Sequence, residues 1–188
     1  GKKVLHVSVG DLAIDPLEEA YDVALSGMTR ADLRTHPRRA AAMVQRHALV
    51  RGDLQCRFLP TGEASPEAIH ALATRLRAVG FKPDLIIVDF LNRMHGAEVA
   101  GREGTDKTAT LARYCEDLVD VARDADAALW TAASGTRGSF QKEFVTIRDF
   151  AWCFEIASIV WYVVAFCQTR VERAMAPPRF RLFGAAGR

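Results

Sequence analysis

The stretch KPDLIIVDFLNRM, residues 82–94, decides how the rest of the chain is interpreted. A run of four aliphatic residues leads into Asp89, and continuous apolar runs are typical of strands covered on both faces of a parallel sheet. Ligands of α/β proteins bind at the carboxyl ends of such strands. Asp89 is therefore the leading candidate for a functional residue, either as a carboxylate that orients water on Mg²⁺ beside phosphates or, equally, as a cap of the next turn.

Similar apolar runs and amphipathic segments alternate on either side of this stretch. Besides 84–90, we expect strands at 4–9, 54–59, 127–133, 158–167 and 179–183. Expected helices run from an Asp15 N-cap with Pro16 to Gly27, irregularly over about 29–50, from Ser65 and Pro66 to Gly80, and from near 105–108 to about 125. Alternation of this kind predicts a single α/β domain, residues 1–188, with a mostly parallel sheet and helices on both faces.

Composition limits the class of protein. Hydrophobic residues make up 49% of the 188 residues, and the formal charge is only +2, so any contact with nucleic acid has to be a local patch. The four cysteines show no metal-ligand spacing, which is typical of buried thiols in a reducing compartment. No apolar run approaches the ~20 residues of a membrane helix. We expect a cytoplasmic protein with no membrane contact.

The segment GREGTDKT, residues 101–108, differs at one position from the phosphate-loop pattern G-x-x-x-x-G-K-[ST]. Asp106 replaces the second glycine and adds a negative charge where phosphate would lie. The segment also follows its strand only after about ten residues, whereas a phosphate loop leaves its strand directly. We interpret it as a loop that ends in a helix cap at Thr105 or Asp106.

The order of VLHVSV, DLIIVDFLNRM and ALWTAASGTRG resembles the RecA-like ATPase core of DnaB-type replicative hexameric helicases, including phage and plasmid relatives. The resemblance covers nearly the whole chain and implies a RecA-like three-layer sandwich. It also implies Mg²⁺ and ATP as cofactors, single-stranded DNA as a partner and assembly into rings. Asp89 then corresponds to the Walker B aspartate, which reaches Mg²⁺ through water, and Arg137 to a nucleotide-binding arginine.

Several positions depart from the family pattern. Gly10 stands where the family's catalytic glutamate lies, and only Arg137 is kept of the sensor element at 133–137. Trp161 replaces a late aspartate, and 185–187 replace a Lys-Asn-Arg element. The family's phosphate loop precedes the strand found here at 4–9, so we expect its strand, loop and helix to be missing. A partner that completes the sheet in their place is then the alternative to assembly of copies into a ring. The prediction is a truncated or degenerate ATPase domain that is deficient in hydrolysis, which leaves open whether the chain is an enzyme.

Basic residues in two loops give an alternative function. Arg93, Arg102 and Lys107 follow the Asp89 strand, and Lys142 and Arg148 follow the strand that ends near 133. Such loops can contact phosphates without reading sequence. The alternative is therefore a non-catalytic assembly or nucleic-acid-binding module. Because acidic residues are interspersed, ordinary solvated loop charges explain the same pattern. A redesigned or otherwise altered sequence would explain why several polar positions of the family carry glycine, alanine or tryptophan here.

Overall fold

The computed structural model describes residues 1–10, 13–95, 107–134, 138–139, 142–149, 153–175 and 179–187. The chain divides into two compact units, one formed by Gly1–Glu98 with Asp117–Ala132 and the other by Val99–Glu116 with Ala133–Arg188. Whether the chain functions as the single domain expected from the sequence remains a prediction.

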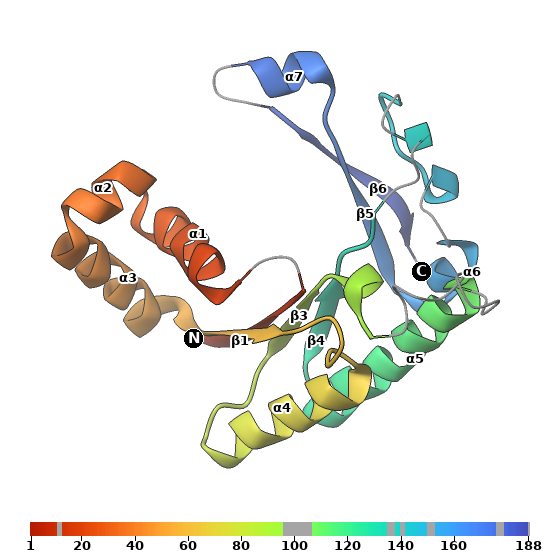
Figure 1. Ribbon diagram of the computed structural model, residues 1–188, viewed down its shortest axis with the longest axis horizontal. Helices are drawn as coiled ribbons and strands as arrows, with labels where there is room; N and C mark the ends of the chain where they lie inside the picture. Colours follow the sequence, from red (N-terminus) through yellow and green to blue (C-terminus); the bar gives the residue numbers. More distant parts are fainter. Residues whose placement is uncertain are drawn as a thin grey trace. The chain divides into compact units, whose positions relative to one another are not determined.

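The first unit contains a four-stranded sheet in which every neighbouring pair is parallel (Figure 1). Its order is β2 (Gly52–Leu59), β1 (Lys2–Val9), β3 (Leu85–Asp89) and β4 (Ala128–Thr131). The α/β class and the parallel sheet predicted from the sequence are thus confirmed. The predicted DLIIVD strand lies between β1 and β4, so strands of this same chain occupy both of its edges.

The two faces of this sheet differ in polarity. Leu5, Val7 and Val9 of β1 and Ile86 and Val88 of β3 are all fully buried on one face. The opposite face carries His6 and Ser8 of β1, and helix α1 (Ile14–Ser26) reaches this face through Tyr21. Helix α4 (Pro66–Ala78) and helix α5 (Lys107–Ala125) lie on the other side of the sheet from α1 in Figure 1. One face is therefore an apolar core, whereas the other carries the polar groups.

Helix starts follow local capping chemistry, with one correction. Ser65 caps α4 by accepting a hydrogen bond from the Ala68 N–H, and Pro66 follows it, as predicted. Helix α1 begins at Ile14, before the predicted cap, so the Asp15 N-cap prediction is wrong. Asp15 instead lies in the first turn, where the helix dipole favours an acid. Gly27 ends α1 at a φ of 68°, as expected.

The irregular region at 29–50 consists of two helices, α2 (Arg30–Thr35) and α3 (Pro37–Arg51). Thr29 begins α2 through a reciprocal capping box with Asp32. His36 lies between the helices with a φ of −128°, because a residue that precedes proline is disfavoured in the helical region. The break at Pro37 explains why the apolar pattern of this region is mixed.

The second unit contains an antiparallel pair, β5 (Tyr162–Cys167) and β6 (Arg181–Gly187), joined through α7 (Arg170–Ala174). Helix α6 (Cys153–Ile159) includes Ser158, so the strand predicted at 158–167 begins later than expected. Among the described residues, no helix is long and apolar enough to cross a membrane.

The apolar sequence around Trp130, Trp152 and Trp161 predicts that these side chains lie in the core. Trp130 and Trp161 are instead 63% and 69% exposed, so the prediction is wrong for both, and Trp152 is outside the described residues. Trp130 pairs with Ile87 in the β3–β4 register and therefore lies on the polar face of the sheet. An apolar sequence context thus failed to predict burial at the edge strand β4.

Shortening Ile69 tests the core beneath the sheet. Ile69 is fully buried on α4, and we expect Ile69→Ala to lower the free energy of unfolding by about 2–5 kcal/mol through lost burial and the cavity left behind. Val79→Ala, at an exposed residue that ends the same helix, is the control and should change it by less than about 0.5 kcal/mol. Equal urea midpoints for the two variants would contradict this packing.

Candidate functional site

Asp89 ends β3 at the carboxyl edge of the parallel sheet, as the sequence predicts. The register places it beside Ser8 of β1, so the ends of the two central strands lie together. The chain then turns into a single helical turn, Leu91–Arg93, which the Leu91 N–H anchors to the Ala132 carbonyl at 3.1 Å. Because the Asp89 side chain is 41% exposed, its carboxylate is accessible to a ligand.

A buried histidine and a tyrosine lie behind this carboxylate. His6 Nδ1 is 2.6 Å from the Tyr21 hydroxyl, and the two rings meet edge to face. His6 Nε2 lies 3.9 Å from Asp89 Oδ2 and has no hydrogen-bond partner within the described part of the chain. Strand β1 supplies His6, strand β3 supplies Asp89 and helix α1 supplies Tyr21. The carboxylate therefore has an exposed side and a side that faces a buried ring.

Burial controls the protonation of these groups. Burial lowers the pKa of His6 below its usual value, and the nearby Asp89 carboxylate only partly opposes this effect. Burial also raises the pKa of Tyr21, with smaller contributions from Cys56 and Asp89. His6 is thus neutral near pH 7, and an Nε2–H tautomer would direct its N–H toward Asp89 while Nδ1 accepts the Tyr21 O–H.

Gly10 follows β1 at the same edge, where both its backbone conformation and the neighbouring Thr61 side chain disfavour a residue with a side chain. Its φ is +77°, and its N–H donates to the Leu59 carbonyl at 3.1 Å. A Cβ at this position would lie 2.3 Å from Thr61 Oγ1. Both the positive φ and this contact disfavour a glutamate here. The resemblance expects a catalytic glutamate at this position, whereas the local backbone conformation favours glycine.

The donor set at this edge limits how a metal ion could be held. Among the described residues, no group of three or more His, Cys, Asp or Glu side chains is arranged to hold a metal ion. Magnesium in nucleotide sites commonly uses one or two carboxylates together with water and phosphate oxygens. The Asp89 carboxylate fits a contact to Mg²⁺ through a water molecule bound to the ion. The described residues do not form a site that would hold the ion by protein ligands alone.

Among the described residues, Arg93 is the predicted cation that belongs to the first unit, and it lies at this edge. Arg93 Cβ lies 3.7 Å from where a Cβ of Gly10 would be, and the residue is exposed. Lys142 in the second unit forms an ion pair with the buried Asp149. Lys107 begins α5 and Arg148 lies in the turn Ile147–Asp149, whereas Arg102 and Arg137 fall outside the described residues. Nucleic-acid binding by these side chains remains a prediction.

Several residues of the site were not selected from the sequence. His6 and Ser8 alternate with valine and leucine in VLHVSV, and this period of two is the signal that one face of the strand is polar. Tyr21 and Thr61 carry no such signal, because they reach the site only through the packing of α1 and of the turn after β2. Most of GREGTDKT lies outside the described residues, so its capping interpretation remains a prediction.

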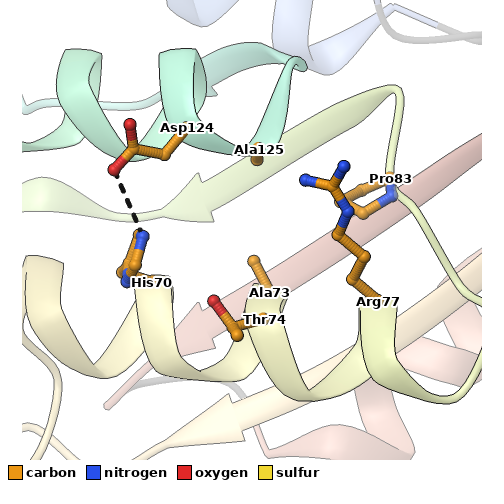
Figure 2. Close-up of a pocket in the computed structure, with 7 residues that line it drawn as sticks. All are labelled: His70, Ala73, Thr74, Arg77, Pro83, Asp124 and Ala125. Atoms are coloured by element: carbon orange, nitrogen blue, oxygen red, sulfur yellow. Dashed lines mark ion pairs between the residues drawn. The ribbon is translucent and has the colours of Figure 1, made fainter.

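A small pocket lies at the opposite, amino end of the strands. Figure 2 shows His70 and Arg77 of α4 facing Asp124 of α5 and Pro83, which precedes β3. His70 Nε2 is 3.3 Å from Asp124 Oδ2, and the side chain of His70 is half-exposed while that of Asp124 is exposed. Because Pro83 and Asp89 flank β3 at opposite ends, this pocket is separate from the edge that carries Asp89.

Comparison with known proteins gives matches by structure only. No protein-family model and no curated protein matches the chain. Two solved structures superpose over 99% of it. One is a DnaB-like replicative helicase described with its interactions with primase, at a TM-score of 0.74 and 9% identity. The other is described as an ATPase domain, at a TM-score of 0.75 and 10% identity.

These matches establish the fold. The chain has the RecA-like α/β fold of DnaB-like helicase ATPase domains, as the resemblance predicted. It spans about half of the helicase, 46% of that chain, and 67% of the second structure, the ATPase domain. At identities this low the similarity concerns the fold, and the activity and partners of those proteins are not thereby those of this chain.

Replacing Gly10 tests the constraint at the end of β1. We expect Gly10→Ala to lower the free energy of unfolding by about 1–2 kcal/mol from the positive φ alone, and by more because of the contact with Thr61. Thr61→Ala removes the clashing oxygen, so the glycine substitution should cost less in that background. Additivity of the two substitutions within about 0.5 kcal/mol, measured by urea unfolding, would contradict the contact.

The buried histidine predicts a pH dependence of stability. Because the folded-state pKa of His6 is lowered, the unfolded chain binds the proton first, and stability falls as pH drops below about 6.5. His6→Gln should flatten the fall in the free energy of unfolding, measured with urea between pH 7.5 and pH 5.5, by at most about 1.4 kcal/mol per pH unit. His70→Gln, at a half-exposed ring, is the control. Identical pH profiles for wild type and His6→Gln would exclude this role of burial.

Proposed function

We propose that the chain is a helicase-type RecA-like domain that does not hydrolyse nucleotides efficiently as it stands. The observation that carries this proposal is Gly10. A residue that activates water needs a basic side chain at the edge where phosphate lies, and a positive φ together with Thr61 disfavours any side chain at this position. The fold is therefore retained while a group that the chemistry requires is replaced by a backbone turn.

Asp89 is the residue through which this domain would contact a metal-bound nucleotide. Its carboxylate is half-exposed at the carboxyl edge of the sheet, where parallel α/β sheets bind ligands. Bound Mg²⁺ would supply charge neutralisation of the phosphates. The contribution of the chain is to hold the carboxylate in place, with Ser8 beside it and the His6 ring behind it.

A nucleic-acid-binding or assembly module is the second candidate function. Arg93 favours it, because this exposed cation lies beside Gly10 at the end of β3. Arg102, Lys107, Lys142 and Arg148 belong to the same hypothesis as residues of the loops that follow the strands. Single-stranded DNA as the partner, assembly of copies into a ring and a cytoplasmic location remain proposals from the resemblance.

Phosphate release tests the main proposal. Purified protein incubated with Mg²⁺ and ATP should release no more phosphate than Asp89→Asn does. Asp84→Asn is the matched control, because Asp84 immediately precedes the same strand at its other end and pairs with Lys2. Turnover that Asp84→Asn keeps and Asp89→Asn loses would show that the site is catalytically competent, and the proposal would be wrong.

A further inference from the structure

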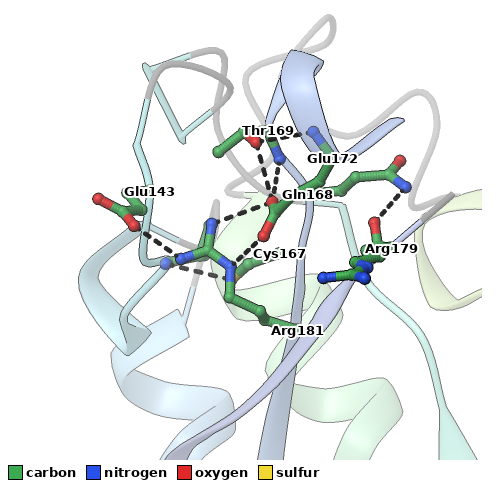
Figure 3. A network of polar contacts seen from close by, with 8 residues as sticks. Glu143, Cys167, Gln168, Thr169, Glu172, Arg179 and Arg181 are labelled. Carbon is green, nitrogen blue, oxygen red and sulfur yellow. Dashed lines mark hydrogen bonds and ion pairs between the residues drawn. The ribbon is translucent and has the colours of Figure 1, made fainter. Parts of the chain in front are cut away.

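One face of the β5–β6 pair is covered by the second unit itself. Arg181 of β6 pairs with Glu172 through Nε at 2.9 Å and with Glu143 at 3.0 Å (Figure 3). Its guanidinium also lies over the Phe144 ring. Cys167 Sγ accepts a hydrogen bond from the Val145 N–H at 3.4 Å. Ala165 and Cys167 are almost fully buried on this face. The segment 142–149 thus covers one side of the pair.

The opposite face is apolar and exposed. Side chains alternate along β5, so Tyr162, Val164 and Phe166 point away from the buried Ala165 and Cys167. Tyr162 and Phe166 are 73% and 72% exposed. Leu182 of β6 pairs with Phe166 and is exposed as well, and Phe180 immediately precedes that strand. We call the exposed residues Tyr162, Val164, Phe166, Phe180 and Leu182 the aromatic face.

Two rings of the aromatic face already form a stacking platform. The centroids of Phe166 and Phe180 lie 5.6 Å apart with 30° between the ring planes. Exposed aromatic rings on a β-sheet are a surface on which unpaired nucleobases stack, at a gain of about 1–3 kcal/mol per base. Base pairs of a duplex are already stacked within their own helix, so such a platform discriminates in favour of single strands.

The segment that carries this face is strongly cationic. Between Tyr162 and Gly187 there are four arginines and one glutamate, although the whole chain carries a formal charge of only +2. Glu172 is already paired with Arg181. The other three, Arg170, Arg173 and Arg179, are exposed and form no ion pair within the described residues. A purely apolar partner would leave these charges unmatched, whereas a phosphate backbone complements them.

We propose that the aromatic face binds single-stranded nucleic acid, with bases stacked on Phe166, Phe180 and Tyr162 and phosphates contacted by Arg170, Arg173 and Arg179. This surface is distinct from the cationic loops named above. It requires neither a bound nucleotide nor Asp89, so it can hold if the ATPase-type proposal fails.

Fluorescence anisotropy with a labelled oligothymidine tests the proposal in the absence of nucleotide and at several salt concentrations. Phe166→Ala with Phe180→Ala should weaken binding at least tenfold and leave the salt dependence unchanged, because stacking is removed and charge is not. Arg170→Gln, Arg173→Gln and Arg179→Gln together should reduce the slope of log K against log salt by about 2, since each phosphate contact on a single strand contributes about 0.7.

Matched controls separate this surface from general effects. Val79→Ala removes an exposed aliphatic side chain, and Arg75→Gln with Arg77→Gln removes exposed charges in the last turn of α4, so both should bind like wild type. Phe166→Tyr with Phe180→Tyr keeps the rings and should retain binding, which guards against a folding defect in the alanine variant. A duplex of the same length should bind more weakly than the single strand.

Three results would overturn the proposal. The first is an oligothymidine affinity of the aromatic and arginine variants equal to that of the controls. The second is binding lost only in Arg93→Gln or Lys142→Gln, which would assign the nucleic acid to the loops. The third is a concentration-dependent dimer, measured by light scattering, that the aromatic variant abolishes while wild type binds no oligonucleotide, which would assign the face to a second copy of the chain.

Discussion

The parallel pairing of β1 with β3 is the interaction on which the rest of the first unit depends. Its register sets His6 opposite Ile87 and Ser8 opposite Asp89, and it brings the ends of both strands to one edge. A shift by one residue would exchange the two faces, because side chains alternate along a strand. The fully buried Leu5 and Val7 prevent such a shift, since they would then face the polar side.

The different polarity of the two faces of the sheet explains how the first unit combines a buried core with an accessible carboxylate. Its apolar face supplies the burial that stabilises the fold, whereas its polar face holds a neutral His6 behind a half-exposed carboxylate. In the second unit the same alternation gives the β5–β6 pair two different faces. One face is linked to Glu143 through Arg181, whereas among the described residues no such network covers the other face. Both candidate surfaces are thus consequences of strand periodicity combined with coverage on one side.

The sequence predicted what depends on local patterns. The run before Asp89, the Ser65 cap and the Gly27 stop are local signals, and the structure confirms all three. Contacts that form only after packing escaped prediction, such as the approach of Tyr21 to His6. Exposure of Trp130 escaped for a related reason, because hydrophobicity of a residue does not reveal whether another element covers it.

The central claim is that Asp89 at the carboxyl edge of the sheet is the functional centre of the first unit. Paramagnetic broadening of backbone amide signals by Mn²⁺ in the presence of ATP tests it most directly. The account predicts that signals of Ser8, Gly10 and the residues around Asp89 broaden first and that Asp89→Asn removes the effect. Earliest broadening around Asp120 and Asp124 of α5, unchanged in Asp89→Asn, would contradict it.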